Sequence, residues 1–192
     1  MPLPRFNPLD DWPLSLMSLL DRLFPSLRTQ ADPRAALRPL YAAIVARGRA
    51  PHWYAQGAVP DTLDGRFDMI AAILCAVLLR LEGEDAARQG SVWLTEIFIE
   101  DMDGQLRQIG IGDMIVGKHI GKMMSALGGR LTAYRAGLTP EGDLNGALVR
   151  NLYRGDAPDA AALDHVAKAL RDLWTALGDT PTPALLAGAL PR

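Results

Sequence analysis

The stretch from Ser91 to Leu138 constrains the fold more than any other, because it combines helical spacing with one abrupt reversal of charge. Acids outnumber bases seven to one between Glu82 and Asp103, whereas bases outnumber acids five to one between Gly104 and Leu138. The segment Gly110-Ile111-Gly112-Asp113 lies at the reversal. Its first glycine can take the left-handed conformation that ends a helix, and its aspartate can cap the next one. The pattern predicts an acidic helix and a basic helix joined as an antiparallel hairpin.

A second strong feature is the run of eleven apolar residues from Met69 to Leu79. A helix that is apolar on nearly every face is normally the buried centre of a bundle. The run is too short to cross a bilayer, which takes about 20 residues. Cys75 lies inside it and is expected to be a small core residue. As the single cysteine, it excludes an internal disulfide and a cysteine-rich zinc site.

Helical spacing recurs along the rest of the chain, and no alternating strand pattern of useful length is present. We therefore predict an all-α, single-domain helical bundle of about six to eight helices, with the hairpin at its centre. Residues 1–30 form an N-terminal segment whose short amphipathic helix docks on the core or meets a partner or membrane surface. Residues 31–178 form the helical domain, and 179–192 a flexible tail. Arg49–Tyr54 is expected to be irregular, and Gly128-Gly129 to break or kink its helix.

Charge and terminal sequence restrict the partners and the compartment. The net charge of −2 provides no overall field favouring DNA or RNA. The first residues contain neither a charged region followed by an apolar one nor the arginine-rich, acid-poor composition of a transit peptide. These observations favour a bacterial cytoplasmic protein.

Motifs for catalysis are not found in the sequence. His52, His119 and His165 form no zinc or di-iron pattern, and no nucleophile elbow or phosphate-binding glycine loop occurs. We expect no catalytic residue, no metal and no cofactor. One alternative is a metal-carboxylate enzyme centred on Glu96 and Glu100, which share a helix face; the other interpretation of these acids is an ordinary solvated face.

The basic half of the hairpin leaves further alternatives open. Lys118, Lys122, Arg130 and Arg135 could meet a polyanion, an acidic partner or anionic lipid, or could simply be solvated. A helical module that binds RNA or the ribosome through this face is therefore the main alternative function.

Several blocks, in order, resemble the ubiquinol–cytochrome c chaperone family. They are Val59-Pro60-Asp61-Thr62, Gly65-Arg66-Phe67-Asp68-Met69-Ile70, Asp101-Met102-Asp103, Leu106-Arg107, Gly110-Ile111-Gly112-Asp113, Val116, Lys118, Gly129-Arg130 and Ala133-Tyr134. The resemblance covers roughly Leu37 to Leu138. It implies an all-α, non-enzymatic assembly factor for the cytochrome bc1 complex that associates with newly made cytochrome b at the membrane. It also implies other bc1 subunits or a small protein as partners, and peripheral contact with the membrane.

The candidate binding residues combine the family blocks with the charge pattern. They are Arg66, Asp68, Glu96, Glu100, Asp101, Asp103, Lys118, Lys122, Arg130 and Tyr134. Membrane proteins concentrate Lys and Arg in their cytoplasmic loops. An acidic face around Glu96, Glu100 and Asp103 is therefore expected to hold basic loops of the client, and the basic face to meet lipid or an acidic partner.

Overall fold

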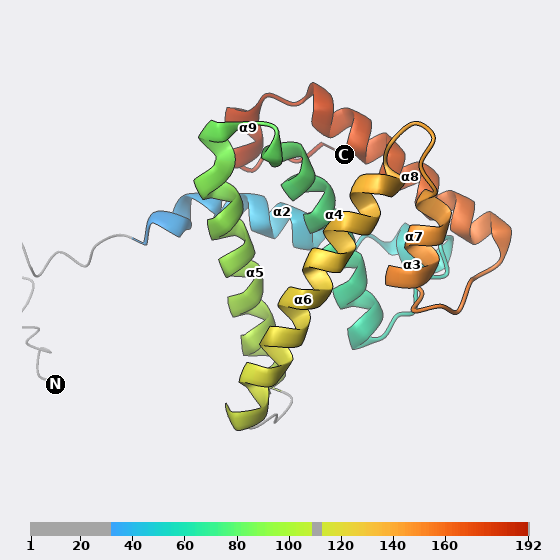
Figure 1. Ribbon diagram of the computed structural model, residues 1–192, viewed down its shortest axis with the longest axis horizontal. Coiled ribbons are helices and arrows are strands. Elements are labelled where there is room, and N and C mark those ends of the chain that lie inside the picture. Colours follow the sequence, from blue (N-terminus) through green and yellow to red (C-terminus); the bar gives the residue numbers. More distant parts are fainter. Residues whose placement is uncertain (1–31, 109–112, 192) are drawn as a thin grey trace, which may run out of the picture. The chain divides into compact units, whose positions relative to one another are not determined.

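Every regular element in the described part of the chain is a helix, which confirms the predicted all-α fold. The structure is a computed structural model and describes residues 32–108 and 113–191; the predicted N-terminal helix and the glycine hinge lie outside these ranges. The elements, shown in Figure 1, are η2 (Pro33–Leu37), α2 (Arg38–Gly48), α3 (Pro51–Ala55), α4 (Leu63–Glu82), η3 (Asp85–Ala87), α5 (Arg88–Gln108), α6 (Asp113–Gly137), α7 (Leu144–Asn151), α8 (Ala160–Asp179) and α9 (Thr182–Leu186). All but η2 belong wholly to the compact unit of residues 36–192.

Helix α4 is the centre of this unit. It begins where Thr62 accepts a hydrogen bond from the Gly65 amide (3.1 Å), which satisfies one of the free N–H groups of the first turn. Every residue from Asp68 to Leu79 is buried, so the prediction of a buried central helix is confirmed. α2, α5, α6 and α8 all pack on α4. Such a position requires apolar side chains on all faces, and the sequence provides them.

Helices α5 and α6 form the predicted hairpin. Figure 1 shows α5 running away from the C-terminal end of α4, and α6 beginning near the far end of α5 and running back past α4. α6 continues through Gly128-Gly129, so of the predicted break or kink the break is wrong. Two helical glycines cost only about 1 kcal/mol each. Leu127, Arg130 and Tyr134, all buried, hold this part of the helix in place.

The segment predicted to be irregular contains the short helix α3. Pro51 occupies its first turn, where proline is tolerated because that N–H has no helical partner. Trp53 is fully buried, and its indole N–H donates to the Arg47 carbonyl at 2.7 Å. The ring thus packs inside the domain.

The C-terminal helices complete the unit. α8 buries Val166, Leu170, Leu173 and Leu177 along one face, at helical spacing. Its C-terminal end is held by Arg80 of α4, whose guanidinium donates to the carbonyls of Leu177 and Thr180. The segment predicted as a flexible tail contains α9, whose Leu185 is fully buried.

Candidate functional site

The acidic residues of the hairpin lie on α5 but differ in exposure. Glu96 and Glu100 are exposed and one helical turn apart, whereas Asp101 and Asp103 are partly buried. Asp101 accepts a hydrogen bond from the Tyr41 hydroxyl at 2.7 Å, and another from the Gln105 amide at 3.1 Å. Asp101 thus fixes α5 to α2, and the two glutamates face outward from a helix that is held in place.

Electrostatics reinforce the Tyr41–Asp101 contact. Burial and the hydrogen bond to Asp101 raise the pKa of the Tyr41 hydroxyl far above its usual value. The hydroxyl therefore stays protonated and remains a donor to the carboxylate. Asp103, one turn before Arg107, accepts from its guanidinium at 2.8 Å. Arg107 thus adds one base at the edge of the acidic surface, which consists of Glu96, Glu100, Asp101 and Asp103 on α5.

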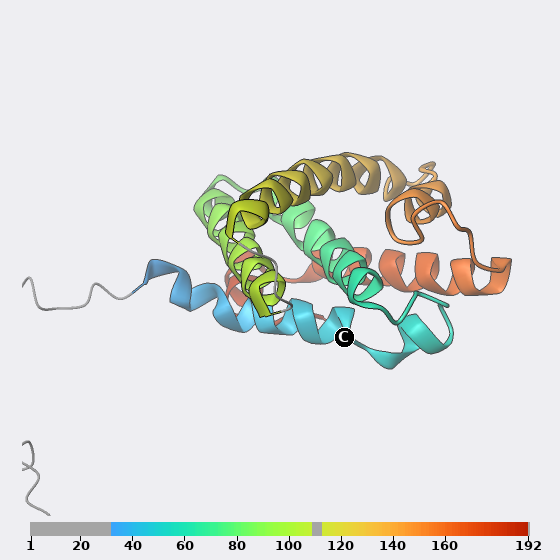
Figure 2. The ribbon, with the colours of Figure 1, turned by 90° about the horizontal axis from the view of Figure 1, so that it is seen from below.

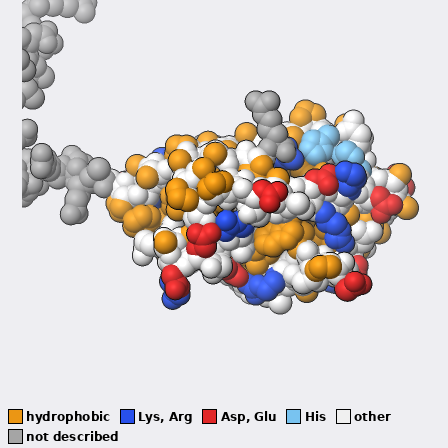
Figure 3. All heavy atoms as spheres, turned by 90° about the horizontal axis from the view of Figure 1, so that it is seen from above, with side chains coloured by type: hydrophobic (Ala, Val, Ile, Leu, Met, Phe, Trp, Pro, Cys, Tyr) orange, Lys and Arg blue, Asp and Glu red, His pale blue; other side chains and the backbone are white. Residues whose placement is uncertain are grey.

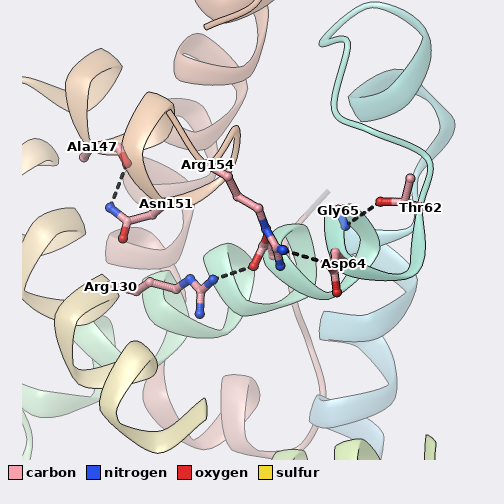
Figure 4. A network of polar contacts seen from close by, with 8 residues as sticks. Thr62, Asp64, Gly65, Arg130, Ala147, Asn151 and Arg154 are labelled. Atoms are coloured by element: carbon pink, nitrogen blue, oxygen red, sulfur yellow. Dashed lines mark hydrogen bonds and ion pairs between the residues drawn. The ribbon is translucent and has the colours of Figure 1, made fainter. Parts of the chain in front are cut away.

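A second group of charged side chains lies between α4, α6 and the loop after α7 (Figure 4). Asp68 of α4 is completely buried. Arg130 of α6 donates to its Oδ1, while Arg154 donates to its Oδ2 at 2.6 Å. Arg154 also reaches Asp64 in the first turn of α4, again at 2.6 Å. Both oxygens of the buried carboxylate are therefore paired, as burial of a charge requires.

Aromatic rings surround this ionic group. The Arg130 guanidinium lies 5.3 Å from the centre of the Phe67 ring, and Phe67 stacks on Phe98 of α5 at 5.6 Å. Burial raises the pKa of Asp68, while Arg154 and Arg130 act in the opposite direction. The charged group and the rings together connect α4, α5 and α6.

Tyr134 and Cys75 belong to the same interior. Tyr134 is 2 % exposed and Cys75 fully buried. Burial raises the pKa of the Cys75 thiol to about 12, which keeps it protonated and unreactive. The expectation that Cys75 is a small core residue is confirmed.

Comparison with known proteins identifies the family. The family model for the ubiquinol–cytochrome C chaperone matches residues 55–191. The chain belongs to this family. The chaperone is also similar to the crystal structure of the Cbp3 homolog from Brucella abortus, with 29 % sequence identity and a TM-score of 0.72, covering 91 % of this chain and 94 % of that chain. None of the curated proteins matches it significantly. Membership makes it an assembly factor for the cytochrome bc1 complex, as the sequence blocks implied.

The structure separates the predicted site residues of the chaperone into three groups. Asp68, Arg130 and Tyr134 are buried and hold α4 against α6. Glu96, Glu100, Asp101 and Asp103 lie together on α5. Arg66 is exposed at the start of α4, where it pairs with Asp61 at 2.6 Å. The buried residues act through the fold, since no partner can reach them while it is intact.

The basic half of the hairpin does not present all its charges on one exposed surface. Lys118 and Lys122 belong to α6, but their side chains lie outside the described part of the chaperone. Arg130 points into the interior, and Arg135 forms an ion pair with Glu82 at 2.6 Å. Figure 3 shows the molecule from above the view of Figure 1; on this face acidic, basic and apolar side chains are intermixed.

Sequence reasoning missed two residues that complete these groups. Arg154 follows α7 in a loop with φ of 55°, and nothing in its local sequence indicates that it reaches Asp68, 86 residues away. Tyr41 is not among the predicted site residues either, yet its hydroxyl donates to Asp101. Among the side chains that the structure describes, no cluster of three or more is suited to a metal, and no helix in the described ranges is both long and apolar enough to cross a bilayer.

Proposed function

We propose that this bc1 assembly chaperone binds newly made cytochrome b at the cytoplasmic face of the membrane, through the acidic surface of α5. The observation that carries the proposal is the position of Glu96 and Glu100, exposed on a helix that Tyr41 and Asp101 fix to α2. Membrane proteins concentrate lysine and arginine in their cytoplasmic loops. An acidic surface next to the membrane can hold such loops before the other bc1 subunits arrive.

The buried group explains how a surface of this kind keeps its shape. Asp68, Arg130 and the Phe67–Phe98 pair connect α5 and α6, the two helices of the hairpin, to α4. A fixed array of carboxylates loses less side-chain entropy on binding than a mobile one. In this proposal Asp68, Arg130 and Tyr134 position the surface, while Glu96, Glu100 and Asp103 contact the client.

Charge reversal of Glu96 and Glu100 to lysine tests the proposal. Tagged chaperone is purified from native membranes, and the cytochrome b that accompanies it is measured. The variant is expected to lose most of the client, because like charges then face its basic loops. The control replaces Glu141 and Asp179, both exposed and remote in sequence from α5, by lysine, which changes the net charge equally. Recovery of cytochrome b by the α5 variant at the level of the control would contradict the proposal.

The basic half of the hairpin enters the proposal as the contact with anionic lipid or with a small acidic partner protein. Lys118 and Lys122 are four residues apart on α6 and therefore lie on one side of it. Reversal of both to glutamate, with the helical content unchanged by circular dichroism, is expected to reduce membrane association. Unchanged membrane association would show that these two lysines do not contribute to it.

A further inference from the structure

One cavity in the described part of the chain lies around α3, between the end of α2 and the start of α4. Its volume is about 710 Å³, and its lining consists of Arg49, Pro51, Tyr54, Ala55, Asp61 and Arg66. Figure 2 shows the end of α2, α3 and the start of α4 following one another around this corner of the fold. Helices α3 and α4 and the segments that precede them therefore contribute to one concave surface.

Two guanidiniums are available in this cavity. Arg49 is exposed, and its side chain has no hydrogen bond or ion pair with any described residue. Arg66 pairs with Asp61 at 2.6 Å, but both side chains are more than half exposed. A guanidinium carries five N–H donors, so Arg66 can hold Asp61 and a second anion together. The cavity thus offers two guanidiniums to a ligand: that of Arg49, with all its donors available, and that of Arg66, with some of its donors already bound to Asp61.

Tyr54 contributes an aromatic ring of fixed orientation to the same cavity. Its hydroxyl donates to the Gly48 carbonyl at 2.8 Å, which sets the orientation of the ring. Burial raises the pKa of this hydroxyl, and Arg66, Asp61 and Arg49 all act on it electrostatically. The three charged groups of the cavity therefore lie near the same phenol. Pro51 and Ala55, both exposed, add an apolar rim.

We propose that this cavity is a docking site for an acidic peptide segment of a partner protein, with carboxylates bound by Arg49 and Arg66. Paired N–H donors of arginine match the two oxygens of a carboxylate, and charge-assisted bonds of this kind are about twice as strong as neutral ones. Its two arginines have the opposite charge to Glu96 and Glu100 of α5. The inference therefore goes beyond the proposed function and does not depend on it.

The charge balance favours a peptide over a membrane surface. Attraction to an anionic bilayer grows with the number of bases near it. Here two arginines line the cavity together with one exposed acid, Asp61, so its net positive charge is small. A concave site with two guanidiniums and an aromatic ring instead suits individual carboxylates on an extended peptide.

The test uses the full chain and a fluorescein-labelled peptide of alternating glutamate and serine, with a glutamine version of the same peptide. Fluorescence anisotropy is expected to show binding of the glutamate peptide only. Arg49→Glu with Arg66→Glu should lower its affinity at least about tenfold, since each 1.4 kcal/mol is a factor of ten. Arg49→Lys keeps the charge but loses the fork, and should give a smaller loss.

The matched control is Arg88→Glu with Lys168→Glu, two exposed bases on α5 and α8 that make the same change in net charge. Its affinity for the glutamate peptide should equal that of the unaltered chaperone. An equal loss in the control, or equal binding of the glutamine peptide, would overturn the proposal. So would phosphatidylglycerol vesicles that bind through Arg49 and Arg66 when the peptide does not. Thermal melting confirms that each variant is folded.

Discussion

Asp68 shows at the scale of one residue how charge and burial are combined in this fold. Its carboxylate is out of contact with water, and each oxygen is paired with a different arginine. One of these, Arg130, is itself 9 % exposed, while Arg154 reaches in from the surface. Removing the carboxylate therefore leaves a buried guanidinium without its counter-charge.

Asp68→Ala is expected to lower the free energy of unfolding by about 3–5 kcal/mol, the usual cost of breaking a buried ion pair from one side. Urea denaturation followed by circular dichroism measures the loss. Asp64→Ala is the matched control, because it removes a carboxylate whose side chain is 68 % exposed from the same Arg154. Equal losses in the two variants would show that burial of Asp68 is not what makes the pair important.

Glycines at two positions of the sequence have opposite roles. A Cβ placed on Gly65 would lie 2.0 Å from the Pro60 carbonyl oxygen, whereas no described atom lies within 4 Å of a Cβ on Gly128. Gly65→Ala should therefore destabilise the protein by at least about 1–3 kcal/mol. Gly128→Ala should stabilise it by up to about 1 kcal/mol, because alanine favours the helix. Thermal unfolding compares the two, and a loss of stability in Gly128→Ala would contradict the open environment seen here.

At the scale of elements, α3 is joined to α8 by two histidines. His52 Nδ1 lies 3.0 Å from His165 Nε2, with the His52 ring packed on Trp53. A hydrogen bond between two imidazoles needs one nitrogen without a proton. Burial, then His165, then Arg47 lower the pKa of His52 below its usual value. The folded state thus favours neutral His52 more than the unfolded state does.

The sign of the pH dependence follows from this lowered pKa. Above about pH 6.5 the ring is neutral in both states and the contact contributes fully. As the pH falls below that value, the unfolded chain takes up the proton first, so stability decreases until the folded ring is protonated as well. The melting temperature is expected to fall between about pH 7 and pH 5. The variant with His52→Gln and His165→Gln should lose this part of the slope, and an unchanged slope would refute the assignment.

Elements with strong local signals were predictable, and those decided by distant contacts were not. The apolar run of α4 and the reversal of charge between α5 and α6 gave their helices directly. α3 was missed because proline was interpreted as a breaker, although Pro51 occupies a first turn. α9 was missed because its stability comes from burial of Leu185 and from contact of Thr182 with Glu84, 98 residues away.

The same limit applies to the candidate site. Charge spacing placed Glu96, Glu100, Asp101 and Asp103 together on one helix, as the structure has them. It could not show that Asp68 and Arg130, 62 residues apart, pair inside the protein. Nor could it bring Arg49 and Arg66 to one cavity. Sequence spacing predicts which side chains of one helix lie together, whereas contacts between helices are known only once the fold is known.

For the whole unit of residues 36–192, packing of α2, α5, α6 and α8 on one helix predicts a single cooperative transition. Trp53, Trp93 and Trp174 lie in α3, α5 and α8, so their fluorescence reports on three outer helices. Its urea midpoint should coincide with that of circular dichroism. Leu74→Ala, in the middle of α4, should lower both midpoints together, with a loss of about 2–5 kcal/mol. Separate midpoints would indicate independently unfolding parts.

Residues of a helix enclosed on every side cannot be replaced without disturbing four neighbouring helices. The outward faces of those neighbours, in contrast, contact only water and the partners they bind. The constraint on α4 therefore leaves recognition to residues that hardly affect the interior. Descendants of one ancestor can exchange one binding specificity for another, by altering charges on α5 or around Tyr54, and keep the architecture they inherited.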